Sequence, residues 1–245
     1  MAEKKRLYTV PEWQMRLVPA IANYLLVDEC VLKHRAVTVG HAITQVYKEH
    51  PRFVKMAAIM EAHIPSTSEP LPLLLEIGSW APYVTSFFKN VSSIAVSLDC
   101  KEWFDTETEI GHVQYDVCSS DFVKWLASNR VSAIVCTHCL EHLAFDPLVM
   151  LRLFVDALIP GGVLLIDVPI GGNVTACRKR LTKLLATKAT NKVTTGHVRV
   201  FEEGDIGKLV RQLGITPVHT ETYWPKVHGA KKPYCTSQIL VGKKS

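Results

Sequence analysis

From residue 73 onward, short apolar runs alternate with amphipathic stretches along the chain. The run LLLEI at Leu73–Ile77 is too continuously apolar for a half-exposed strand, so it predicts a buried strand covered on both faces. Further strands are predicted at Ser93–Leu98, His112–Tyr115, Ala133–Cys136, Val163–Val168, Ile215–Thr222 and Ser237–Val241. Helices are predicted between most of them, at Tyr83–Asn90, Ser119–Ser128, Pro147–Leu158 and Glu203–Leu213. Strands that alternate with helices predict an α/β fold with a mostly parallel sheet and helices on both faces.

The N-terminal quarter of the chain carries a helical pattern of apolar positions instead. Thr38 can cap one helix there, and Pro51 can open another. The segment Ile64–Pro72 contains three prolines and small polar residues, which is typical of a linker. We therefore predict a helical cap or lid over residues 1–68 and a main domain over residues 69–245.

The residues at the carboxyl ends of the predicted strands are candidates for ligand binding, because parallel sheets bind ligands at that edge. The first strand leads into Gly78, which can make a sharp turn into the next helix. The second ends at Asp99, which could accept hydrogen bonds from the two hydroxyls of a ribose. The third ends at Asp116, and the fourth delivers His138 to the same edge. These positions indicate a site for a nucleotide-like ligand. The fifth strand is preceded by Pro160–Gly162, which predicts the turn from a helix into that strand.

The composition limits the class of protein. The chain has 245 residues, of which 48% are hydrophobic, and this is enough for a sizeable core. No run is long enough for a membrane-spanning helix and the N-terminus lacks an apolar signal core, so we expect a soluble cytoplasmic protein without a membrane partner. The seven scattered cysteines favour reduced thiols over a disulfide framework. The formal net charge of +5 is modest and does not by itself imply nucleic acid.

The sequence from Leu73 to Lys243 resembles the class I, Rossmann-like methyltransferases that use S-adenosylmethionine, in the branch that acts on small molecules. LLLEIGS resembles their first motif, SIAVSLD their second-strand acid and VQYDV their acid on the adenine side. The most specific part of the resemblance is CLEHLAFDPLVMLRLFVDALIPGGVLLIDVP, whose spacing also matches. The resemblance implies a doubly wound, mostly parallel sheet of seven strands, of which the last is antiparallel.

Carried over position by position, the resemblance implies a set of cofactor-binding residues along the strand ends. They are Glu76, Gly78, Ser79, Trp80, Asp99, Cys100, Asp116, Val117, Cys136, Thr137 and His138. Gly78 and Ser79 would pass close to the methionine part of S-adenosylmethionine. Asp99 would hold the ribose hydroxyls, and Asp116 would bind the adenine edge.

The predicted function is methyl transfer from S-adenosylmethionine to an acceptor that the sequence does not identify. The main task of the protein in such a reaction is to align the acceptor behind the methyl group. A base is needed only where the attacking atom carries a proton, and His138 is the candidate catalytic residue.

The segment Asn173–Phe201 follows the fifth strand, contains no acid and is rich in lysine and arginine. We place Arg178, Arg180 and Lys183 on the substrate side, where they would bind an anionic substrate such as a phosphorylated metabolite. RNA is a second anionic candidate, although the segment lacks the interleaved aromatic residues that stack unpaired bases. The alternative is a solvated basic helix over Thr175–Ala186 that binds no ligand.

Trp80 and Pro82 stand where related methyltransferases have glycines that let the backbone approach the ligand. A non-catalytic binding or scaffold protein with the same fold is therefore the main alternative. A nicotinamide-dependent enzyme is a weaker alternative, because a bound pyrophosphate needs those glycines more.

His138, Glu141 and His142 also match the H-x-x-E-H pattern of zinc peptidases, in which two histidines of one helix share a metal and the glutamate acts as base. The apolar strand directly before His138 disfavours such a helix. Cys136 and Cys139 form an isolated C-x-x-C pair, which is a weak zinc signal and is more typical of small buried hydrophobes. We therefore assign no metal, keep a zinc hydrolase as a remote alternative and expect His142 to pack within the fold.

Overall fold

The computed structural model describes residues 39–64, 73–78, 94–99, 111–117, 119–143, 145–186, 197–223 and 236–245. The chain divides into two units, Met1–Val54 and Lys55–Ser245. This division falls inside the helix α3, Val39–His63.

Helix α3 corrects the prediction that one helix ends before Pro51 and another begins there. The helix continues through Pro51, although an interior proline removes one backbone hydrogen bond and its ring clashes with the preceding turn. Met56 and Met60 are fully buried, whereas Val54, predicted on the apolar face, is 48% exposed. The predicted linker beyond Ile64 lies outside the described residues, so the predicted domain boundary within it stays a prediction.

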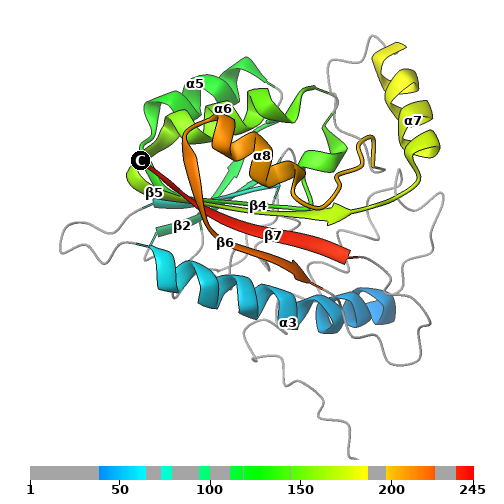
Figure 1. The fold of residues 1–245 in the computed structure, drawn as a ribbon, viewed down its shortest axis with the longest axis horizontal. Helices are drawn as coiled ribbons and strands as arrows, with labels where there is room; N and C mark the ends of the chain where they lie inside the picture. The colour runs from blue at the N-terminus through cyan, green and yellow to red at the C-terminus, as the bar shows by residue number, and fades with distance from the viewer. Residues whose placement is uncertain are drawn as a thin grey trace, which may run out of the picture. The chain divides into compact units, whose positions relative to one another are not determined.

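The strands form one sheet in the order β3-β2-β1-β4-β5-β7-β6 (Figure 1). Their bounds are β1 Leu73–Ile77, β2 Ile94–Asp99, β3 Gly111–Gln114, β4 Val131–Thr137, β5 Leu158–Ile170, β6 Ile215–Tyr223 and β7 Thr236–Lys244. The pairs β1–β2, β1–β4, β2–β3 and β4–β5 are parallel, whereas β7 is antiparallel to β5 and to β6. The prediction of an α/β fold with a mostly parallel sheet is confirmed.

The helices α5 (Ser120–Ser128), α6 (Pro147–Ala157) and α8 (Asp205–Gln212) cover one face of this sheet (Figure 1). The helices after β3 are α5 Ser120–Ser128, the 3₁₀ helix η1 Leu140–His142, α6 Pro147–Ala157, α7 Val174–Ala186 and α8 Asp205–Gln212. The core on the covered face joins residues such as Phe122 of α5, Phe154 of α6 and Val210 of α8 to Leu75 and Ile77 of β1. The predicted helix Tyr83–Asn90 lies outside the described residues. No helix in the described ranges is both long and apolar enough to cross a membrane.

Local sequence explains where α5 and α6 begin. The Ser119 hydroxyl accepts a hydrogen bond from the Phe122 N–H at 3.1 Å, which caps the N-terminus of α5. The Asp146 carboxylate accepts from the Leu148 N–H at 2.9 Å, and Pro147 occupies the first turn of α6, where its missing N–H costs nothing.

The predicted turn Pro160–Gly162 lies inside β5 and not before it. The strand β5 already begins at Leu158, and its register against β4 shifts between Val131 and Ala133. The turn residues therefore leave the ladder as a bulge, in which Gly161 takes a φ of +76°. Pairing resumes on the far side of the bulge, so the strand is longer than the sequence predicted.

Lys244 links the end of the chain to the end of α6. Its Nζ donates hydrogen bonds to the carbonyl oxygens of Val155 at 2.7 Å and Leu158 at 2.6 Å, and carbonyls at a helix C-terminus otherwise lack helical partners. We expect Lys244→Met to lower the free energy of unfolding by about 1–2 kcal/mol, because charge-assisted hydrogen bonds are lost. Urea unfolding measures the change. Lys243→Met, whose side chain alternates to the other face of β7, is the matched control, and an equal loss in both variants would contradict the assignment.

Candidate functional site

The register of the sheet brings predicted site residues to one edge. The last residue of β1 lies opposite Leu98 of β2 and Cys136 of β4. The next positions along these strands are Gly78, Asp99 and Thr137, which are therefore neighbours at the carboxyl edge. This is the edge at which open parallel sheets bind ligands.

Gly78 makes a turn at this edge that other residue types would not tolerate. Its φ is +70°, and a Cβ at this position would lie 2.9 Å from the Cys139 Sγ and 3.0 Å from the Cys139 Cβ. Both the left-handed backbone and the close approach require glycine. The chain therefore leaves β1 directly against the segment that follows β4.

Cys136 and Thr137 end β4 as buried residues, and Thr137 is 6% exposed. A hydrogen bond with Cys139, together with burial, raises the pKa of the Cys136 thiol well above its ordinary value. The thiol is therefore protonated at neutral pH, which is the unreactive form. This agrees with the interpretation of Cys136 as a small buried hydrophobe, whereas Cys139 is only partly buried.

The acids of the first and third strands lie in different environments. Glu76 is fully buried within β1. Asp116 is half-buried after β3, its carbonyl accepts from the Ser119 N–H at 2.8 Å, and Val117 beside it is 7% exposed. The described structure thus places Asp116 and Val117 at the turn into α5. Ser79, Trp80, Pro82 and Cys100 lie outside the described residues, so their roles stay predictions.

His138 has a strained backbone. Its φ of +46° is the single positive φ of a non-glycine residue among those the structure describes. Histidine is one of the residue types that tolerate this region, yet the conformation costs roughly 1–2 kcal/mol. The His138 N–H donates to the Asp167 carbonyl at 2.8 Å, which anchors the strained residue to β5.

The ring of His138 lies between two buried carboxylates. Its Nε2 is 3.0 Å from the Ser237 hydroxyl and 3.6 Å from Asp167 Oδ2, while its Nδ1 is 3.9 Å from Glu141 Oε1. Both carboxylates are fully buried, whereas the His138 side chain is 31% exposed. The ring can therefore meet a ligand on its exposed side, while its nitrogens face a hydroxyl and two carboxylates.

The sequence did not predict Asp167 and Ser237 as neighbours of His138. Asp167 interrupts the apolar run VLLIDVP of β5, and an acid within a buried strand was the available signal. Ser237 comes from β7, which is distant in sequence, and no local pattern pointed to it.

The geometry does not support the zinc-peptidase alternative. Glu141 and His142 lie in the short helix η1, whereas His138 precedes it at the end of β4. The two histidines therefore do not share the face of one α-helix, which that chemistry needs. The expectation that His142 packs within the fold is confirmed, because its ring meets that of His197 edge-on at a centroid distance of 5.0 Å.

The basic helix α7 follows the carboxyl end of β5 (Figure 1). Arg178, Arg180 and Lys183 are exposed on it, and Arg180 Nη1 donates to the His197 carbonyl at 3.1 Å. Arg178 lines a groove of about 660 Å³ between α7, α8 and the segment 198–202. His138 and Gly78 do not line that groove, so the substrate-side role of the basic residues stays a prediction.

Residues 74–220 match the protein family described as methyltransferase domain. No curated protein sequence matches the chain. Among solved structures, the CurJ carbon methyltransferase is similar with a TM-score of 0.59 and 16% sequence identity, over 95% of this chain and 69% of that chain.

Two further similar structures carry a bound product of the cofactor. The 1,6-didemethyltoxoflavin-N1-methyltransferase of Burkholderia thailandensis, with 1,6-didemethyltoxoflavin and S-adenosylhomocysteine, has a TM-score of 0.56 and 15% identity over 97% of this chain and 92% of that chain. The magnesium protoporphyrin IX methyltransferase of Synechocystis PCC 6803, with S-adenosylhomocysteine, has a TM-score of 0.57 and 13% identity over 93% of this chain and 99% of that chain. At such identities the likeness shows a shared fold. The family match covers more than half of the chain, and this chain therefore belongs to the methyltransferase domain family.

Proposed function

We propose that this chain is an enzyme that transfers a methyl group from S-adenosylmethionine to a small-molecule acceptor. The observation that carries the proposal is the left-handed turn at Gly78 beside Asp99 and Thr137 on one edge of the sheet. Membership of the methyltransferase domain family supports the reaction class. Two proteins with the same fold bind S-adenosylhomocysteine, which supports the cofactor.

The proposed contacts with S-adenosylmethionine lie at this edge. Gly78 adopts a left-handed turn, and its missing Cβ leaves room for Cys139, so the loop after β1 can turn sharply at this edge. Asp99 ends β2, where an acid accepts hydrogen bonds from ribose hydroxyls. Asp116 and the Val117 N–H follow β3 and would bind the adenine edge. The remaining proposed contacts are Glu76, Ser79, Trp80, Cys100, Cys136, Thr137 and His138.

S-adenosylmethionine supplies an activated methyl group on a sulfonium when it is bound. His138 is the proposed acid–base group, and its partly exposed ring would take the proton of the acceptor. Glu141 and Asp167 lie 3.9 Å and 3.6 Å from its ring nitrogens and would stabilise the imidazolium that forms. The strained backbone of His138 supports a positioning role, since strain of this kind is often found at functional sites.

The acceptor is proposed to be a small molecule with an anionic group. Arg178, Arg180 and Lys183 are exposed on the helix that follows β5, so they could attract such a group. RNA has no support beyond the positive charge of this segment.

The finer details of the fold are also proposed from the family. They are a Rossmann-like sheet of seven strands with an antiparallel last strand, and an N-terminal helical cap or lid over residues 1–68. The enzyme is proposed to be cytoplasmic. A second candidate function is a non-catalytic binding protein with the same fold, which Trp80 and Pro82 favour because they replace glycines at the proposed cofactor turn.

The first experiment is a thermal shift with S-adenosylhomocysteine on protein treated with a chelator. At about 100 times the dissociation constant the ligand adds about 2.7 kcal/mol, which raises the melting temperature by about 5–11 °C for a domain of this size. No shift at millimolar ligand would overturn the cofactor proposal and leave the non-catalytic alternative.

Asp99→Ala tests the assignment of the ribose site. We expect a loss of about 1–3 kcal/mol in the binding free energy of S-adenosylhomocysteine, because hydrogen bonds to a charged acceptor disappear. Isothermal titration calorimetry measures it. Asp121→Ala removes an exposed acid of α5 that forms an exposed ion pair with Lys124 at 3.4 Å. It is the control and should bind as the wild type does. Equal affinities in all three proteins would refute the ribose assignment.

His138→Gln tests the acid–base role. The release of S-adenosylhomocysteine is measured with a set of small phenols, thiols and amines that carry carboxylate or phosphate groups. With any acceptor that the wild type methylates, we expect kcat to fall by about 10²–10⁴-fold, while the affinity for S-adenosylhomocysteine changes little. His219→Gln, on β6, is the matched control. A variant of His138 with wild-type kcat at every pH would exclude the role.

A further inference from the structure

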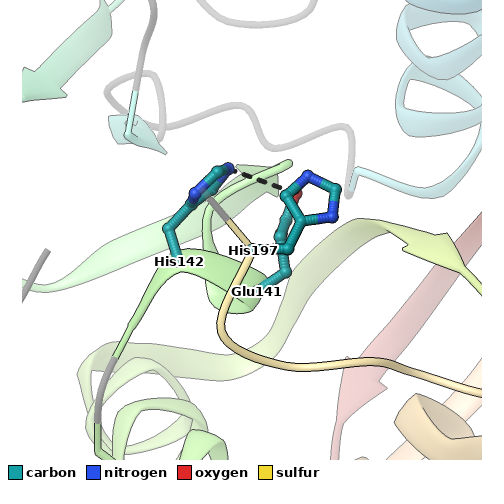
Figure 2. A group of neighbouring side chains, drawn as sticks. All are labelled: Glu141, His142 and His197. Carbon is teal, nitrogen blue, oxygen red and sulfur yellow. Dashed lines mark ion pairs between the residues drawn. The ribbon is translucent and has the colours of Figure 1, made fainter. Parts of the chain in front are cut away.

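Beyond His138, the buried carboxylate of Glu141 has two other histidines beside it. Its Oε1 lies 3.7 Å from His142 Nε2 and 3.9 Å from His197 Nε2. Figure 2 shows the three side chains turned toward one another, with Glu141 and His142 on η1 and His197 on a segment far along the chain. One ligand atom from each residue lies within 4.8 Å of the other two.

We propose that Glu141, His142 and His197 form a binding site for a divalent transition metal ion, with Zn²⁺ as the best fit. Imidazole nitrogens and a carboxylate oxygen are ligands that Zn²⁺ commonly takes, and two histidines with one glutamate leave a fourth position for water or a substrate atom. The proposal goes beyond methyl transfer and does not depend on it. It also departs from the sequence-based assignment of no metal. That assignment weighed His138 and His142 as the metal ligands and Glu141 as a base, whereas the site proposed here uses Glu141 itself as a ligand.

The distances are close to those of a zinc site. Bonds of about 2.0–2.2 Å in a tetrahedron place ligand atoms roughly 3.3–3.5 Å apart. The two distances from Glu141 Oε1 are 3.7 Å and 3.9 Å, and the ligand atoms of the two histidines lie within 4.8 Å of each other. An ion therefore needs the carboxylate to close by a few tenths of an ångström and the two histidine rings to approach each other by up to about 1.5 Å. The side chains of His142 and His197 are 23% and 42% exposed, which leaves an entry path and lets their rings adjust.

The backbone holds the two ligand-bearing segments together without an ion. The Glu141 carbonyl accepts hydrogen bonds from the N–H groups of Val198 at 2.9 Å and Arg199 at 3.2 Å. The Arg199 guanidinium in turn donates to the carbonyls of Leu143, at 3.2 Å, and Phe145. These bonds hold the residues that directly follow His197 beside η1, and a preformed site of this kind costs little ordering on binding.

The charges also suit a cation. A buried carboxylate is normally paired or bound to a metal, and neutral imidazoles are the form that coordinates. Arg180 donates to the backbone carbonyl of His197 and not to its ring, so the ring nitrogens remain available to an ion.

The test uses the full chain, freed of metal with a chelator and then titrated with Zn²⁺ against a chromophoric competitor. We expect one Zn²⁺ per chain, bound without S-adenosylmethionine. His142→Ala and His197→Ala should each weaken binding by about 100-fold or more, because even the loss of an outer partner of a metal ligand costs about 10–100-fold. Glu141→Gln keeps the size of the side chain and should lose most of the affinity.

His219→Ala is the matched control, because His219 also lies beside a carboxylate, at 3.5 Å from Glu221, but outside the cluster. It should bind Zn²⁺ as the wild type does. Substitution with Co²⁺ gives a second measurement. A visible spectrum typical of a four-coordinate ion, without a thiolate charge-transfer band, supports the assignment. A thiolate charge-transfer band would assign the metal to Cys136 and Cys139 and overturn the proposal. Binding that is absent in the wild type, or equal in the wild type and His197→Ala, also overturns it.

The result is separable from that for methyl transfer. His197 is half-exposed, so His197→Ala should keep the circular dichroism spectrum of the wild type and its thermal shift with S-adenosylhomocysteine in metal-free protein. Loss of Zn²⁺ binding with that shift retained supports the metal site. Failure of the S-adenosylhomocysteine shift in every protein, with Zn²⁺ binding intact, would refute the cofactor and leave the metal site standing.

Discussion

Strand β4 is paired with β1 on one side and β5 on the other, and all seven of its residues are buried. Its end cannot shift without breaking ladder hydrogen bonds to both neighbours. The candidate groups of the site depend on that fixed position. Gly78 leaves β1 against Cys139, and Asp167 of β5 holds the backbone of His138 at the end of β4. The geometry of the proposed active site therefore follows from the two-sided pairing of one central strand.

The same strand end gathers titratable side chains at unusual density. Glu141 and Asp167 are fully buried, and histidines lie beside both carboxylates. Burying carboxylates is costly, so clusters of this kind are more often kept for binding or chemistry than for stability. The strained φ of His138 is a separate cost at the same place. The two observations together set this edge apart from the rest of the described sheet.

The strands and the helices α5, α6, α7 and α8 could be predicted because each leaves a local pattern. Continuous apolar runs mark buried parallel strands, and Ser119 and Pro147 mark helix starts. The errors came where a proline or glycine that is typical of an element boundary lies inside an element. Pro160–Gly162 has the composition of a turn, yet β5 continues past it because the ladder to β4 resumes beyond the bulge. Pro51 has the composition of a helix start, yet α3 continues through it.

Which residues end the parallel strands follows from the sequence alone. Each continuous apolar run defines one strand, and the end of the run identifies the residue at the carboxyl end of that strand. Gly78, Asp99 and Thr137 can therefore be assigned to one edge from the sequence alone, and the family resemblance rests on the same residues. Only the tertiary structure decided what surrounds His138 and Glu141. Asp167, His197 and Ser237 reach that cluster from segments far apart in the chain, through the order of the strands and through backbone hydrogen bonds between loops. Contacts of this kind leave no periodic signal in the sequence, since no helix or strand repeat relates the residues that meet.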